Sequence, residues 1–171
     1  AFVTQWDKLF DKAKAIRNTI KPRFSQLLAV KTFHHKMREE AIDGQLFYAN
    51  SSAVRLGNIF SDQYISVNRG VNGIEGSLST AVGYAIAHQD EEDVNCVIGD
   101  LSFFYDQNAL WNESLSPNLS ILLLNNGGGG IFHQLSGLER SPYRDSAIGA
   151  EHTTSAEGIC QAHDIVYLSA H

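Results

Sequence analysis

The sequence predicts an α/β fold in which helices cover both faces of a doubly wound parallel sheet, a three-layer αβα arrangement. From residue 44 onward, short apolar runs alternate with segments whose apolar residues recur at helical spacing. Such alternation is typical of parallel sheets, because each parallel connection needs a crossover that a helix usually provides. With 171 residues, the chain is long enough for one domain with a substantial core.

Five strands and six helices are expected along the chain. The predicted strands are the apolar runs 46–49, 64–67, 94–98, 120–124 and 165–168. The predicted helices are 2–20, 24–41, 52–60, 74–87, 103–112 and 155–163. The helix at 74–87 carries an apolar stripe made of Ile74, Leu78, Ala81 and Ala85.

Two parts of the chain differ in pattern. Residues 1–43 are predicted to form a helical lead-in or linker, interrupted at Pro22. Residues 44–171 are predicted to form one domain, truncated at its C-terminus. Because the chain starts without Met and stops just after the last apolar run, we expect a fragment of a longer polypeptide.

Composition narrows the classes of partner. Apolar residues make up 43% and charged residues 19%, which is typical of a globular protein. The net charge is −6 and no Lys/Arg-rich stripe occurs, so nucleic acid is not expected as a partner. Apolar stretches are all shorter than a membrane span and no signal-peptide pattern occurs, so we expect a cytoplasmic protein without a membrane partner.

Several titratable groups are expected to be structural. Cys96 and Cys160 are predicted to be buried free thiols, since no disulfide framework or metal-binding spacing occurs. His34 and His35 are interpreted as ordinary packing or surface histidines. The acidic run 90–93 is interpreted as a solvated loop before a strand.

Polar residues follow four of the predicted strands at the points where those strands end. They are Asn50 and Ser51, then Asn68, Arg69 and Gly70, then Asp100 and Ser102, and finally residues 125–130. In an open parallel sheet, ligands bind outside the carboxyl ends of the strands. Because these four segments would share that edge, we expect one binding site there rather than four unrelated loops.

Asp100, Asn126 and Gly128 carry the oxygen atoms that a divalent cation on a diphosphate needs. They would supply a carboxylate, an amide oxygen and a main-chain carbonyl, and Mg²⁺ prefers such ligands together with phosphate oxygens. Glycines at 127–130 would let backbone groups approach a phosphate with no Cβ in the way. The alternatives are a helix N-cap at 100–102 and a flexible turn at 125–130. The grouping of these residues at one edge favours the binding site.

Further candidates lie at the same edge. Ser51 would cap the helix after the first strand and also donate to a phosphate, and the helix near Ser102 would point free N–H groups at the phosphates. Arg55 and Arg69 would bind carboxylates through their forked donors, with surface ion pairs as the alternative. The apolar residues that would either line a pocket or belong to the core are Ile131, Phe132 and Leu135.

The segments around Asp100 and Asn126 resemble the diphosphate-binding signature of thiamine diphosphate enzymes. That signature is Gly-Asp-Gly, a spacer and Asn-Asn. Here it reads Gly99-Asp100-Leu101, 23 intervening residues and Asn125-Asn126, so leucine replaces the second glycine and the spacer is slightly short. These departures fit one subfamily, the menaquinone-pathway 2-succinyl-5-enolpyruvyl-6-hydroxy-3-cyclohexene-1-carboxylate synthases.

The resemblance to these synthases covers residues 44–136 and rests on four blocks in the right order. The blocks are residues 50–56, 68–76, 99–110 and 125–132. The resemblance implies the thiamine diphosphate-binding fold and the following roles. Mg²⁺ (or Mn²⁺) would be bound by Asp100, Asn126 and the Gly128 carbonyl. The cofactor would be held by Ser51, Leu101 and Ser102, with Ile74 behind it. Substrate carboxylates would meet Arg55 and Arg69, beside a pocket wall of Ile131, Phe132 and Leu135.

The reaction that the resemblance implies has two anionic substrates. The enzyme would decarboxylate 2-oxoglutarate and add the remaining four-carbon unit to isochorismate. In the family, a Glu on the pyrimidine-binding domain of a partner subunit activates the cofactor, within a homodimer or homotetramer. No segment of this chain matches that domain, so we expect it to be inactive alone. The alternatives are a carboligase or decarboxylase of the acetolactate synthase type and a non-catalytic assembly domain of the same fold.

Overall fold

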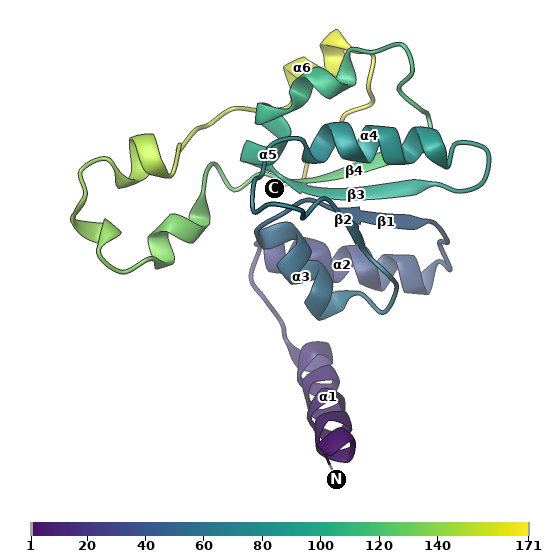
Figure 1. Ribbon diagram of the computed structural model, residues 1–171, viewed down its shortest axis with the longest axis vertical. Helices are drawn as coiled ribbons and strands as arrows, with labels where there is room; N and C mark the ends of the chain where they lie inside the picture. The colour runs from purple at the N-terminus through teal and green to yellow at the C-terminus, as the bar shows by residue number, and fades with distance from the viewer. Residues whose placement is uncertain (1, 171) are drawn as a thin grey trace.

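A four-stranded, all-parallel sheet lies at the centre of the computed structural model, which describes residues 2–170 (Figure 1). The strands are β1 (Gln45–Tyr48), β2 (Ser66–Val67), β3 (Val94–Gly99) and β4 (Leu119–Leu124). They are arranged in the order β2-β1-β3-β4. Phe47 is in register with Ser66 on one side and with Cys96 on the other. Because β3 is placed beside β1 rather than β2, the chain reverses its direction across the sheet between these two central strands.

Helices cover both faces of the sheet, which confirms the three-layer arrangement (Figure 1). One face carries α2 (Gln26–Glu39) and α3 (Ser52–Phe60). The other face carries α4 (Ser77–Ala87), α5 (Asp100–Tyr105) and α6 (Glu157–Ala162). Short 3-10 and π turns complete the chain at η1 (Gln107–Leu110), η2 (Gly130–Gln134), η3 (Leu138–Arg140) and η4 (Arg144–Ile148).

The core forms where the central strands meet these two helical layers. Its largest fully buried side chains are those of Tyr48, Phe47, Phe60, Leu46, Leu78 and Ile98. Strand β3 has buried residues in consecutive positions, because both of its faces are covered. The stripe of α4 is confirmed at Leu78, Ala81 and Ala85, all of which are buried. Ile74 lies outside it, because Gly76 is in the left-handed region and the helix begins only at Ser77.

The predicted strand at 165–168 is wrong. This segment pairs with none of the described strands. Its residues alternate as a strand would, with Ile165 and Tyr167 packed against the core and Val166 and Leu168 exposed at 86% and 89%. Alternation reports only that one face is buried, whereas a strand also requires a partner edge. The segment instead begins with a hydrogen bond from Ile165 N to Cys160 O (2.9 Å) at the end of α6.

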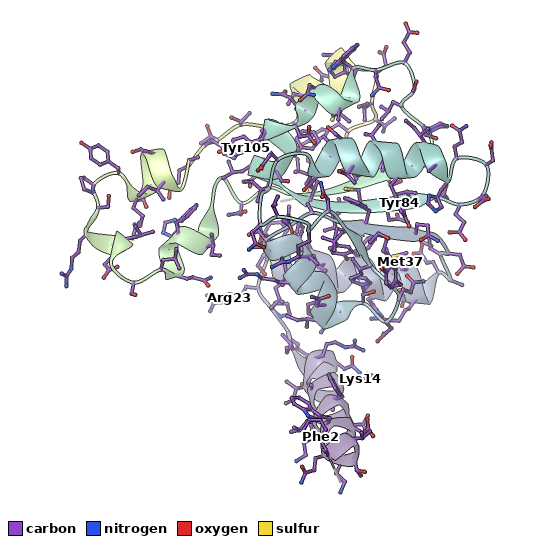
Figure 2. The ribbon with its side chains drawn as sticks, in the orientation of Figure 1. Phe2, Lys14, Arg23, Met37, Tyr84 and Tyr105 are labelled. Carbon is purple, nitrogen blue, oxygen red and sulfur yellow. The ribbon has the colours of Figure 1, made fainter. Side chains whose placement is uncertain are left out.

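Helix α1 (Phe2–Thr19) forms as predicted but stands away from the sheet, with Phe2 near its far end and Lys14 on a turn closer to the sheet (Figure 2). None of its residues is buried. Arg17 joins its last turn to Asp62 through an ion pair of 3.1 Å. Helix α2, by contrast, packs Val30 and Met37 into the core. Within residues 2–170, no helix combines the length and the apolarity that crossing a bilayer would take.

The titratable groups expected to be structural are confirmed as such. Cys96 and Cys160 are buried and free. His34 is buried, with Nε2 2.7 Å from the Tyr48 hydroxyl, whereas His35 is exposed and pairs with Glu39. Residues 90–93 are exposed in the connection that leads into β3.

Candidate functional site

The candidate site lies where β1 and β3 end side by side. Tyr48 at the end of β1 is in register with Val97 of β3. From this point the chain enters α3 on one face of the sheet and α5 on the other (Figure 1). Loops that leave neighbouring strands for opposite faces open a crevice between them, and this is where open α/β sheets bind ligands.

Asp100 is the buried centre of this region. It is the first residue of α5, and only 3% of it is exposed. Its Oδ1 accepts a hydrogen bond from Leu101 N (2.8 Å), and its Oδ2 accepts one from Gly128 N (2.8 Å). The second bond joins residues 28 positions apart and ties the end of β3 to the loop after β4. A buried carboxylate needs such donors, because it has lost its hydration.

Asn126 and Gly128 adjoin Asp100, so the three predicted cation ligands lie in one cluster. Asn126 Nδ2 donates to Gly128 O (2.9 Å). Gly128 has φ +144°, and a Cβ there would lie 3.0 Å from Gly149 O. Only glycine allows both this backbone conformation and this close approach. The loop therefore depends on glycine for its shape as well as for access to its backbone.

Gln26 at the start of α2 is a contact of this cluster that the sequence did not reveal. Its Nε2 lies 2.5 Å from Asn126 Oδ1 and 3.4 Å from Leu124 O. In this arrangement the Asn126 amide turns its NH₂ group, rather than its oxygen, toward the Gly128 carbonyl. A 180° turn of the Asn126 amide exchanges the positions of its O and N, and a matching turn of the Gln26 amide keeps a hydrogen bond between the two side chains. The same Asn126 side chain can therefore present its oxygen beside that carbonyl.

Asn50 and Ser51 join the loops after β1 and β2. Asn50 is buried, and its Nδ2 donates to the backbone carbonyls of Asn68 (2.9 Å) and Gly73 (2.5 Å). Ser51 has φ +69°, an uncommon conformation for a residue other than glycine. It occupies the cap position of α3 but makes no side-chain cap hydrogen bond, so the predicted capping role is wrong. The Ser51 hydroxyl stays free of that bond at the edge of the crevice.

Ser102 and Ile74 are brought together across the crevice. The buried Ser102 hydroxyl donates to the Ile74 carbonyl, which fixes the loop after β2 against α5. Ile74 and Leu101 are both half-buried. The Ser102 hydroxyl therefore donates to the backbone in this structure. A diphosphate would have to compete with the Ile74 carbonyl for this hydrogen bond.

Arg55 on α3 and Arg69 in the loop after β2 are both exposed. Neither forms an ion pair with any other residue in 2–170, so the surface ion-pair alternative is not realised in the described chain. Their guanidinium groups keep their donors available for an anion.

The three apolar candidates lie on an arm, residues 130–148, that extends to one side of the sheet (Figure 1). Ile131 and Phe132 are half-buried and Leu135 is exposed, so none of them belongs to the core. Phe132 lies directly beside Gly129. The structure thus places the start of the arm next to the Asp100 cluster and leaves Leu135 out in solvent.

His152, after the arm, is a second contact that the sequence did not reveal. Its Nε2 lies 3.2 Å from Asp100 Oδ2, and its backbone N donates to Gly127 O (3.0 Å). No strand or helix holds this residue, so neither periodicity nor the strand-end rule could single it out.

No protein-family model matches the chain. It is 51% identical over 126 residues to a 2-succinyl-5-enolpyruvyl-6-hydroxy-3-cyclohexene-1-carboxylate synthase of Phocaeicola vulgatus. It is 54% identical over 125 residues to a synthase of the same name from Bacteroides fragilis. These alignments take in 72% and 71% of the chain. The chain is a homologue of a segment of this synthase family.

Synthase relatives are longer than the segment they share with this chain, which spans 22% of each of the two proteins just named. The synthase of Flavobacterium johnsoniae aligns with 99% of this chain at 36% identity, and this alignment spans 30% of that protein. The similarity to the synthases therefore extends over both the sheet and the N-terminal helices.

Proposed function

We propose that this chain is the diphosphate- and Mg²⁺-binding part of a thiamine diphosphate-dependent synthase of menaquinone biosynthesis. The whole enzyme would decarboxylate 2-oxoglutarate and add the resulting four-carbon unit to isochorismate. The observation that carries the proposal is the cluster of Asp100, Asn126 and Gly128. It lies beside β1 and β3, between which the chain reverses the direction in which it adds strands to the sheet. The names of the homologues support the reaction.

The residues present fit a cation bound to a diphosphate. Asp100 offers a carboxylate already oriented by two backbone donors. Gly128 offers a carbonyl, and Asn126 offers an amide oxygen once its O and N are exchanged. Three oxygens on one side leave the remaining positions of an octahedron to phosphate oxygens and water, as Mg²⁺ prefers. Mn²⁺ accepts the same ligands.

Around this cation, other residues would bind and orient the reactants. Ser51 and Ser102, with the Leu101 backbone, would donate to the diphosphate, and Ile74 would support the organic part of the cofactor. Thiamine diphosphate, when bound, supplies the electron sink that lets a 2-oxo acid lose CO₂. Arg55 and Arg69 would hold the substrate carboxylates, which would otherwise be repelled by a chain of net charge −6. The pocket wall would be formed by Ile131, Phe132 and Leu135.

The catalytic half of the site would come from outside this chain. We infer that a pyrimidine-binding domain of a partner subunit supplies the glutamate that activates the cofactor, within a homo-oligomer in the cytoplasm. Residues 1–43 would then lead into a diphosphate-binding domain at 44–171. The chain alone would bind ligands without turnover. No observation favours an acetolactate synthase type of enzyme or a non-catalytic assembly domain.

A chimera tests this proposal. The matching segment of the Bacteroides fragilis synthase is replaced by this chain, and loss of 2-oxoglutarate with isochorismate present is followed. We expect cofactor-dependent activity, which Asp100→Asn abolishes because the cation loses a charged ligand. Asp90→Asn, a matched change in an exposed loop, should leave the activity unchanged. Full activity of the Asp100→Asn chimera would overturn the assignment.

A further inference from the structure

His152 approaches Asp100 from a part of the chain that none of the strand ends supplies. It belongs to the segment that returns from the arm toward α6. Its Nε2 lies 3.2 Å from Asp100 Oδ2, and the two side chains are exposed at only 16% and 4%. The contact joins a buried carboxylate to a nearly buried imidazole that neither the strand-end rule nor the family resemblance singled out.

The orientation of the imidazole is fixed on several sides. Thr154 N donates to His152 Nδ1 (3.1 Å). The backbone N of His152 donates to Gly127 O (3.0 Å), in the loop that carries the predicted cation ligands. The ring stands edge-on to Phe104, with centroids 5.2 Å apart and planes at 90°. These contacts leave the ring little freedom to turn away from Asp100.

The same contacts determine which nitrogen of the neutral ring carries the proton. An Nδ1 that accepts from a backbone N–H holds no proton, so the proton of the neutral imidazole is on Nε2. That nitrogen is buried, and no acceptor in the described chain meets it at hydrogen-bonding angles. Its nearest charged neighbour is Asp100 Oδ2. A carboxylate oxygen has two lone pairs, so Oδ2 can accept from His152 as well as from Gly128 N.

We propose that His152 is a positioning residue: a small rotation of its ring lets Nε2–H donate to Asp100 Oδ2, 3.2 Å away, and so hold the carboxylate in the orientation in which it binds a divalent cation on a diphosphate. This inference rests on the proposed function, because it takes Asp100 as a cation ligand. Groups that hydrogen-bond a ligating carboxylate restrict its rotation, and their loss typically weakens metal binding by about 10- to 100-fold. The return segment after the arm thereby becomes part of the cation site.

The test measures cation binding by this chain directly. Wild type, Asp100→Asn, His152→Leu and His152→Gln are titrated with Mn²⁺ in the presence of inorganic pyrophosphate, and bound Mn²⁺ is followed by electron paramagnetic resonance. Wild type should bind, and Asp100→Asn should not. His152→Leu, which fills the space without a donor, should bind about 10- to 100-fold more weakly. His152→Gln, which can place an amide N–H near the former Nε2, should recover most of the affinity.

Controls separate positioning from folding. Thermal unfolding of all variants should show that they remain folded, and His35→Leu, at an exposed position on α2, should bind as wild type does. Failure of wild type to bind Mn²⁺–pyrophosphate would overturn the proposed site itself. Loss in Asp100→Asn alone, with His152→Leu unchanged, would leave that site standing and overturn the role of His152. Equal loss in His152→Leu and His152→Gln would show that the ring matters only for packing, and would also overturn it.

Discussion

Polar side chains are buried at the carboxyl ends of the strands and exposed at the amino end of β3. At the carboxyl ends of the strands, Asn50, Asp100 and Ser102 are buried and hydrogen-bonded to the backbone. At the amino end of β3, the acidic residues 90–93 are exposed. Burying a carboxylate lowers the stability of the fold by several kcal/mol unless donors replace its hydration, whereas exposed acidic side chains in a loop lower it little.

The difference shows where the chain keeps a polar side chain in a fixed orientation although burying it lowers stability. An apolar residue at position 100 would avoid the cost of burying charge, yet the chain keeps a carboxylate there and gives it donors from the first turn of α5 and from the loop after β4. Such buried polar groups are typical of sites that must hold a ligand in one orientation. The carboxyl edge is therefore specified in detail, and the amino edge is not.

The largest expected difference in unfolding free energy is between a glycine substitution at the carboxyl edge of the sheet and one in a helix away from it. Gly128→Ala places a Cβ 3.0 Å from Gly149 O at φ +144°, and we expect it to cost about 3 kcal/mol and to abolish binding of Mn²⁺–pyrophosphate. Gly83→Ala is the matched control, since a Cβ there meets nothing within 4 Å in the middle of α4. It should stabilise the chain by about 1 kcal/mol. Equal unfolding free energies of the two variants in urea would contradict this account.

Acid should reveal the cost of a polar group buried away from the site. Burial, together with the nearby charge of Arg38, lowers the pKa of His34 to about 4. Because this pKa is below the value of about 6.5 in the unfolded chain, stability is full above pH 6.5 and is lost as pH falls toward 4. We expect a loss of up to about 3 kcal/mol over this range.

Denaturant unfolding at pH 7, 5.5 and 4.5 measures this loss. His34→Gln should flatten the pH dependence, because glutamine does not titrate. His35→Gln, at the exposed neighbouring position, should leave it as in wild type. The same pH dependence in wild type and in His34→Gln would assign the loss to other groups.

Asp106 supplies a smaller, purely structural comparison. This buried carboxylate accepts from Ser79 N (2.6 Å) and Ser79 Oγ (2.5 Å), and so caps the first turn of α4. Asp106→Ala should therefore cost about 2 kcal/mol of unfolding free energy. The control is Asp90→Ala in the exposed loop, with an expected change below about 0.5 kcal/mol. A cost as small as that of the control would remove Asp106 as a cap.

The arginines should have the smallest effect on stability and a clear effect on activity. Arg55→Ala and Arg69→Ala remove exposed side chains without ion pairs in the described chain, so each should change stability by less than about 0.5 kcal/mol. In the chimera, each should raise KM for a carboxylate substrate or lower kcat. Unchanged kinetics in both variants would remove them from the site.

The sequence predicted those parts of the molecule that depend on local pattern. Asp100 and Asn126 follow apolar strands directly, so the strand-end rule predicts that they lie together, as they do. Their contacts with Gln26 and His152 could not be predicted, because these residues arrive from a helix and a loop that are distant in sequence. The cap of α4 by Asp106 was missed for the same reason.

The errors also have physical causes. The apolar residues at 165–168 alternate correctly but find no partner edge, which a sequence pattern cannot report. Ser51 occupies the cap position of α3 with a positive φ (+69°), and its side chain makes no cap hydrogen bond. The division at residue 44, the roles of the site residues and the location of the protein stay predictions.

Binding of thiamine diphosphate tests the central claim most directly. Calorimetric titrations of wild type and Asp100→Asn, each with and without Mg²⁺, compare the four conditions that matter. Asp100 and its neighbours predict heat of binding only for wild type with Mg²⁺, and none after the single exchange of oxygen for nitrogen in Asp100→Asn. Binding that needs no Mg²⁺, or that Asp100→Asn retains, would contradict a cation-bridged diphosphate at the junction of β1 and β3.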